Sequence, residues 1–121
     1  MIRKHFLQLD CLGVRDLHFF GDDLYIPVGP TMVLNGEIRV FKWPTAMHLL
    51  AANRDPVRFE SVLTESVSLP HGRSANRAEA LCDLPPELSG GKPALLVLYD
   101  ASGPDRRKGD CTVFGDLLRH D

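Results

Sequence analysis

The chain has 121 residues, which is close to the commonest size of a single folded domain. Its hydrophobic fraction of 44% and charged fraction of 25% are ordinary for a globular protein and exclude a chain that is disordered throughout. The 14 Lys and Arg residues against 16 Asp and Glu residues give a net charge of −2, which excludes a general affinity for nucleic acid or for an anionic membrane. We therefore expect one globular domain over residues 1–121.

The first 43 residues predict a β-rich beginning. Residues 2–9 and 14–20 are each typical of a strand, and a Gly-Asp-Asp turn then leads to a short strand over 24–28. Pro27 removes one backbone hydrogen-bond donor, so this third strand is predicted to lie at the edge of a sheet.

Asn35-Gly36 lies between two apolar runs, a pattern that is typical of a β-hairpin with a two-residue type I′ turn. Such a turn sets Thr31 opposite Val40. Because side chains alternate along a strand, both faces of this hairpin are then apolar. One face holds Val33, Ile38 and Val40, and the other holds Met32, Leu34, Phe41 and Trp43.

Phe41 and Trp43 are candidate binding residues, because one apolar face of the hairpin must be covered if the other enters the core. A helix predicted over 45–53, which begins after Pro44 and has a broad apolar face, could cover them and make them core residues. Otherwise they form an exposed patch of the kind that marks a protein–protein contact.

The middle of the chain continues the strand pattern. Residues 57–69 alternate as a half-buried antiparallel strand, interrupted by a bulge or bend near residues 61–65. Residues 75–84 fit either a short helix capped by Ser74 or a strand over 78–84, and the pattern does not decide between them.

Near the C-terminus, residues 85–91 are typical of a loop. Residues 94–99 lack any alternation, which predicts a central strand with both faces covered. Residues 111–114 could return beside that strand, and residues 116–121 are expected to form a frayed tail or a helical turn.

These segments predict a β-rich α+β fold, in which one or two short helices pack on an antiparallel or mixed sheet of about five to seven strands. The alternative is an all-β sandwich or barrel, which the many short strands and turn signals favour.

Arg106, Arg107 and Lys108 form the densest basic cluster of the chain. Such a cluster can bind phosphates or an acidic partner. Asp105 and Asp110 flank it and no aromatic residues are interleaved, so a solvated hairpin tip is favoured over a nucleic-acid site.

The three cysteines, Cys11, Cys82 and Cys111, contain no CxxC or CxxH pair, so we expect buried free thiols, no metal site and no cofactor. Residues 1–10 lack the apolar core of a secretory signal, and no apolar stretch reaches the roughly 18 residues that span a bilayer. These features predict the cytoplasm as the location.

The sequence shows no GxSxG, Walker A or GxGxxG motif, so it does not identify a catalytic residue. We therefore expect a small protein-binding or accessory module, inhibitor-like or immunity-like, that acts by surface contact. Its expected partner is another protein and not nucleic acid or a membrane, and a homo-oligomer stays open. The alternative is a small enzyme or ligand-binding barrel with dispersed site residues, with His71, Glu79 or a cysteine in its pocket.

Overall fold

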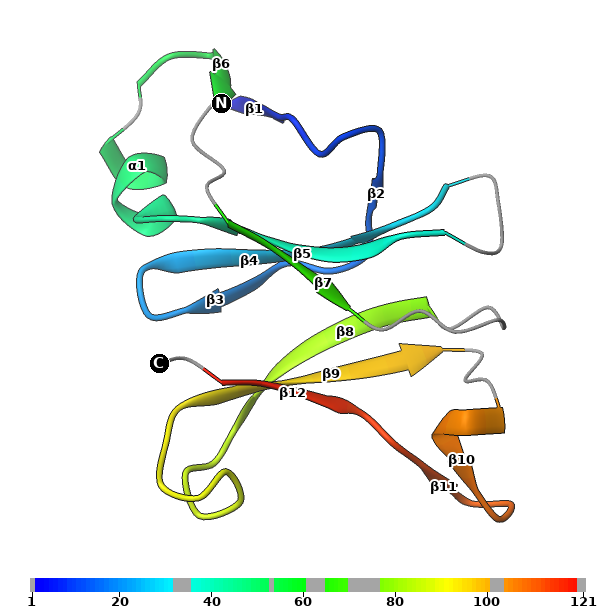
Figure 1. The fold of residues 1–121 in the computed structure, drawn as a ribbon. Coiled ribbons are helices and arrows are strands. Elements are labelled where there is room, and N and C mark those ends of the chain that lie inside the picture. Colours follow the sequence, from blue (N-terminus) through cyan, green and yellow to red (C-terminus); the bar gives the residue numbers. More distant parts are fainter. Residues whose placement is uncertain are drawn as a thin grey trace.

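Two β-sheets stacked face to face form most of the protein, and the N-terminal segment and a helix cover the far side of the first sheet (Figure 1). The computed structural model describes residues 2–31, 36–52, 54–60, 65–69, 77–100 and 104–119.

The first sheet is built around β4 (Asp23–Gly29) and β5 (Ile38–Trp43), which pair antiparallel. β7 (Glu65–Leu69) pairs with the far side of β5. Two short strands, β2 (Gly13–Val14) and β3 (His18–Phe20), share the other side of β4.

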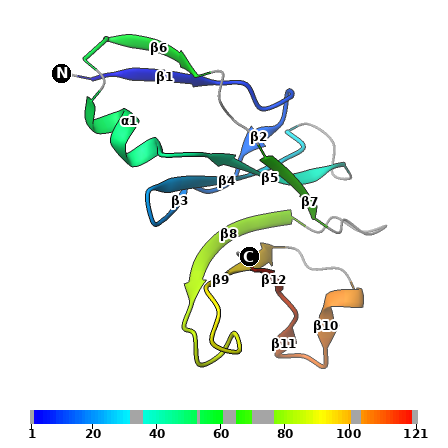
Figure 2. The same ribbon diagram turned by 60° about the vertical axis from the view of Figure 1, so that its left-hand side comes forward.

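The second sheet is antiparallel and has the order β12-β9-β8. Its strands are β8 (Arg77–Leu84), β9 (Ala94–Asp100) and β12 (Asp116–Arg119). In both ribbon views this sheet lies against the first one through β8, which contacts β3 and β4 (Figure 2).

Four smaller elements complete the described structure. β1 (Lys4–Leu7) pairs in parallel with β6 (Val57–Glu60). The helix α1 (Ala46–Ala52) follows β5 and contacts β4. After β9, a single 3-10 turn over Pro104–Arg106 leads into a hairpin of β10 (Arg107–Lys108) and β11 (Thr112–Val113).

The hydrophobic core has two parts, one on each face of the first sheet. Between the sheets, Ile38 and Val40 of β5 pack with Leu95 and Val97 of β9. On the opposite face lie Leu24, Ile26, Val28, Phe41, Trp43 and Ala46, with side chains of α1 and of the N-terminal segment packed around them. The prediction that both faces of residues 38–43 are apolar is therefore confirmed, and the predicted helix supplies part of the cover.

The predicted hairpin register is wrong. Val40 lies opposite Pro27, and not opposite Thr31, so β5 is shifted by four residues along β4 and the connection spans residues 30–37. The observed register pairs buried side chains with one another, for example Ile26 with Phe41. Burial of these pairs outweighs the local preference of the turn. Asn35 itself lies outside the described residues.

The prediction that Pro27 lies on an edge strand is also wrong, because β4 has neighbours on both sides. The carbonyl oxygen of Pro27 accepts a hydrogen bond from the backbone N–H of Arg15 at 2.9 Å. The N–H that proline lacks would point to the same side of β4 as this carbonyl, where the gap between β2 and β3 lies. An interior strand tolerates proline here because the neighbouring strand is already interrupted at that point.

Residues 57–69 do not form one antiparallel strand. β6 pairs in parallel with β1, whereas β7 belongs to the first sheet, and residues 61–64 between them lie outside the described residues. Alternation shows only that one face of each segment is buried, so it could not reveal that the two segments join different sheets. In the segment 75–84, the strand alternative is the one that forms, as β8.

The central position of residues 94–99 and the loop at 85–91 are both confirmed. Residues 111–114 do not pair with β9, because residues 112–113 pair back on β10 in a short hairpin. The strand that pairs with β9 at this position is β12. Its residues lie in the segment 116–121, for which a frayed tail or a helical turn is predicted.

The predicted β-rich α+β class is confirmed, with antiparallel sheets, one parallel strand pair and one α-helix among the described residues. The sheets in this part of the chain are open and do not close into a barrel. No helix among the described residues has the length and apolar character needed to cross a membrane.

Gly115 immediately precedes β12, at a point where the chain runs very close to β9. A Cβ atom at this position would lie 2.6 Å from the carbonyl oxygen of Val97 and 2.9 Å from Cδ1 of Leu96. Because the carbonyl is backbone, β12 would have to move away, so Gly115→Ala should lower the free energy of unfolding by about 1–3 kcal/mol in urea denaturation.

Gly29→Ala is the matched control for Gly115→Ala. At Gly29 the nearest atom to the new Cβ is Nε of the Arg15 side chain, at 3.4 Å, and this side chain can shift. We expect a change below about 1 kcal/mol. Equal losses in the two variants would contradict the close approach of β12 to β9.

Candidate functional site

The structure separates the basic cluster into one buried and two exposed residues. Arg106 is only 7% exposed. Arg107 and Lys108 form β10 and are exposed, where they lie opposite Val113 and Thr112 of β11. The three residues therefore do not act as one basic patch, and the solvated hairpin tip that the sequence favoured consists of Arg107 and Lys108.

Arg106 is held by two residues of the second sheet. Its Nη2 atom donates to Oδ2 of Asp116 at 2.9 Å, and its guanidinium lies over the ring of Tyr99 with 3.7 Å between Cζ and the ring centroid. The hydroxyl of Tyr99 donates to the same carboxylate oxygen at 2.5 Å. We call Tyr99, Arg106 and Asp116 the clamp, because they fasten the β10–β11 hairpin to β9 and β12.

The clamp shifts the pKa of each member. Burial acts to raise the pKa of Asp116, but the hydrogen bonds from Arg106 and Tyr99 outweigh it and hold that pKa below its ordinary value. Burial raises the pKa of Tyr99, and the neighbouring carboxylate raises it further. Burial acts to lower the pKa of Arg106, but the Asp116 carboxylate outweighs it, so the guanidinium stays charged.

The second sheet also presents an apolar surface on the side away from the first sheet. Along β9, Leu95 and Val97 point into the core between the sheets, so Leu96 and Leu98 point outward. The register of the sheet adds their neighbours on β8 and β12. We define the outer face as the apolar residues on this side, which are Ala80, Cys82, Leu84, Ala94, Leu96, Leu98 and Leu117. The charged residues Asp100 and Arg119 also point to this side, at the ends of β9 and β12.

The outer face is only partly covered. Leu98 is 40% exposed and Leu117 is 43% exposed. The turn over residues 86–90 and the β10–β11 hairpin both extend from the sheet on the side away from β4 and β5 (Figures 1 and 2). They bring further exposed apolar side chains to this end of the molecule, those of Leu88, Val113 and Phe114.

Sequence reasoning did not name the outer face as a site, although its signal was present. The absence of alternation in residues 94–99 predicts a strand that is covered on both faces. The structure covers one face and leaves Leu98 on the other face exposed.

The aromatic candidates Phe41 and Trp43 lie in the interior. They are 6% and 2% exposed, beside Ala46 of α1. In this structure they are packing residues and do not form an exposed patch, because α1 and the N-terminal segment cover them.

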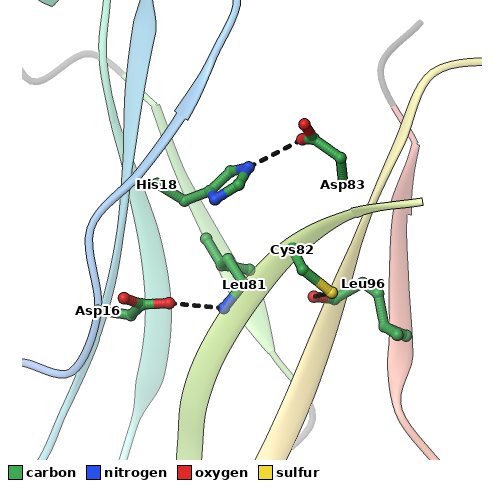
Figure 3. A network of polar contacts seen from close by, with 6 residues as sticks. All are labelled: Asp16, His18, Leu81, Cys82, Asp83 and Leu96. Carbon is green, nitrogen blue, oxygen red and sulfur yellow. Dashed lines mark hydrogen bonds and ion pairs between the residues drawn. The ribbon is translucent and has the colours of Figure 1, made fainter. Parts of the chain in front are cut away.

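A row of polar contacts joins the segment before and within β3 to β8 (Figure 3). The carboxylate of Asp16 accepts the backbone N–H of Leu81 at 2.8 Å, and Nε2 of His18 lies 2.8 Å from Oδ1 of Asp83. These partners are 65 residues apart in the sequence. The row therefore fixes one edge of β8 against the first sheet.

The histidine and thiol candidates do not assemble into a catalytic site among the described residues. His71 lies outside them, and Glu79 forms a partly exposed ion pair with Arg15 at 3.5 Å. Three other histidines pair with carboxylates, and these pairs are His5–Glu60, His18–Asp83 and His48–Asp22. A carboxylate can orient a histidine as a base, but no serine or cysteine in the described parts of the chain hydrogen-bonds to any of these rings.

The His5–Glu60 pair has a structural explanation. Oε1 of the buried Glu60 lies 3.1 Å from Nδ1 of His5 on β1 and 3.0 Å from Nε of Arg58 on β6. The carboxylate therefore ties the two parallel strands together. The His5 ring also packs against Trp43, with 5.8 Å between ring centroids.

All three cysteines are free, and the prediction that they are buried is wrong for two of them. Cys11 and Cys111 are exposed because each lies in a turn, while Cys82 is half-buried on the outer face. Within the described residues, no group of three or more His, Cys, Asp or Glu side chains could hold a metal ion.

The depressed pKa of Asp116 gives a test of the clamp. A carboxylate with a depressed folded-state pKa adds stability above its unfolded-state pKa of about 3.9, and this stability is lost as the pH falls through the folded-state value. Asp116→Asn should therefore lower the free energy of unfolding by about 1–2 kcal/mol near pH 7 and by much less below about pH 3. Urea denaturation across this pH range measures both effects.

Asp110→Asn is the control for Asp116→Asn, since Asp110 is exposed in the turn of the same hairpin. We expect this variant to follow the wild type within about 0.5 kcal/mol at every pH. A deficit in Asp116→Asn that does not change with pH would contradict the charged clamp.

Comparison with known proteins gives a family and no closer relative. Residues 1–116 match the family described as "Protein of unknown function (DUF3616)". Neither the curated proteins nor the solved structures include a significant match to the chain. The matched region contains the first sheet, β8, β9, the clamp and the hairpin, so the match extends over nearly all of the fold described above. The chain therefore belongs to the DUF3616 family.

Proposed function

We propose that this protein is a protein-binding module, and that a partner polypeptide covers the outer face of the second sheet. In this role it acts as an accessory protein, inhibitor-like or immunity-like, through surface contact and not through chemistry. The single observation that carries the proposal is the exposure of Leu98 and Leu117 on a sheet face whose outward positions are apolar except for Asp100 and Arg119, which lie at the ends of β9 and β12.

The hydrophobic effect favours such an association. Full burial of a leucine side chain is worth about 1.5–3 kcal/mol, so covering the exposed part of Leu98 or Leu117 contributes about 1 kcal/mol each. Ala80 and Cys82 on β8 are small, so a partner can approach the sheet closely beside Leu96 and Leu98. Soluble proteins rarely leave a contiguous apolar surface open unless it serves an interaction.

A charged hairpin tip lies at the same end of the second sheet, and the clamp attaches it on the side of Val97, opposite to the outer face. Arg107 and Lys108 are exposed on a hairpin that the clamp holds at the side of β12. Charges at the rim of an interface raise the association rate more than the final affinity. A partner that carries acidic groups beside an apolar patch therefore fits this end of the molecule.

Leu98→Glu tests the proposal by placing a charge at the centre of the outer face. Leu98 is 40% exposed, so the variant should fold, and circular dichroism and urea denaturation check this. Wild-type protein used as bait in extracts of its native host should recover one protein partner in stoichiometric amount. We expect Leu98→Glu to lose that partner by at least about tenfold in quantitative mass spectrometry, because burying an unpaired carboxylate costs more than about 1.4 kcal/mol.

Val57→Glu is the matched control. Val57 is 49% exposed on β6, which pairs with β1 and lies on the far side of the first sheet from the outer face. This bait should recover the same partner as the wild type. Equal recovery by wild type and Leu98→Glu, or a co-purified small molecule in place of a protein, would refute the binding-module proposal.

A further inference from the structure

β12 forms one edge of the second sheet, and no described strand pairs with its outer side. An edge strand exposes backbone N–H and C=O groups that can bind a further strand. The opposite edge of the same sheet, which β8 forms, is covered by other parts of the chain. There the carboxylate of Asp16 accepts the N–H of Leu81, so the first sheet closes the edge of β8 (Figure 3).

The same hydrogen bond shows which groups of β12 point outward. The N–H of Leu81 points away from β9, so in the Leu81–Val97 pair the N–H and C=O of Val97 point toward β12. This agrees with the short distance of 2.6 Å between the Val97 oxygen and an added Cβ at Gly115. Asp116, which is opposite Val97, therefore points its backbone groups toward β9.

Backbone groups alternate in direction along a strand, so those of Leu117 and Arg119 point away from β9. The side chain of Leu117 meanwhile lies on the outer face. At this edge the chain thus offers a row of backbone hydrogen-bonding groups directly beside exposed apolar side chains. This combination is the chemistry that an extended peptide recognises, because the backbone gives affinity and alternate side chains give specificity.

The geometry points to strand addition: an extended segment of a separate polypeptide pairs with the free edge of β12 and becomes the fourth strand of the second sheet. The apolar side chains of this segment lie at alternate positions, on the same side as Leu98 and Leu117. The inference rests on the proposed function, since it specifies the partner that covers the same surface.

The test uses a displayed library of peptides of roughly ten residues, the upper length of an ordinary strand. Selection is made on the full-length protein, and enriched peptides are synthesised with a fluorescent label for anisotropy titrations. We expect enriched sequences to alternate apolar and polar residues. Arg119→Pro removes an outward N–H and leaves the hydrogen bonds to β9 in place, so it should weaken binding at least about tenfold.

Arg119→Ala is the matched control, because it removes the same side chain and keeps the N–H. It should change the affinity less than about threefold. A second measurement avoids any effect on folding, because it modifies only the peptide. Two peptides are compared, one N-methylated at its odd-numbered amides and the other at its even-numbered amides. One of the two should lose binding and the other should bind almost as before, since only alternate amides face β12.

Strand addition is refuted if no peptide is enriched or if Arg119→Pro binds the peptides as tightly as Arg119→Ala does. It is also refuted if the two N-methylated peptides lose affinity equally. Dimerisation of the free protein that Arg119→Pro abolishes would replace the separate polypeptide by a second copy of the chain. Loss of the captured host partner in Leu98→Glu, with full retention in Arg119→Pro, would refute strand addition and leave the proposed function standing.

Discussion

The burial of β4 and β5 on both faces is the constraint on which the rest of the structure depends. Ile38 and Val40 point into the core between the sheets, and Phe41 and Trp43 point into the core under α1. A strand pair that is apolar on both sides needs cover from two directions. The second sheet supplies one cover, and α1 with the N-terminal segment supplies the other. The layered arrangement of the molecule follows from this requirement.

β9 has the same two-sided apolar character, but the described chain covers its outer face only in part, since Ala94 there is buried and Leu98 is exposed. Leu95 and Val97 are buried against the first sheet, whereas Leu98 is exposed on the outer face. This difference between two similar strands links the fold to the proposed function. The clamp also determines the surroundings of this surface, because Asp116 fastens the charged hairpin at the side of β12.

The candidate site could be predicted only in part. The sequence located the basic cluster, but the burial of Arg106 depends on Tyr99 and Asp116, which reach it only after β9 and β12 have paired. The outer face was implied by the lack of alternation in residues 94–99. The sequence did not indicate that this face is left partly open, because periodicity shows how apolar a face is and cannot show what packs on it. Contacts such as Asp16 with Leu81 join residues 65 apart and leave no local pattern.

By itself, the sequence determined the β-rich α+β class, the places of the helix after Pro44 and of the central strand at 94–99, and the loop at 85–91. These features depend on local preferences and on periodicity, which short segments carry. Only the tertiary structure decided the register of β5 on β4, the interior place of Pro27, the division of residues 57–69 between two sheets, and the pairing of β12 with β9. Each of these depends on which distant apolar surfaces are buried together, and that burial outweighs the weaker preference of a turn, a proline or a tail.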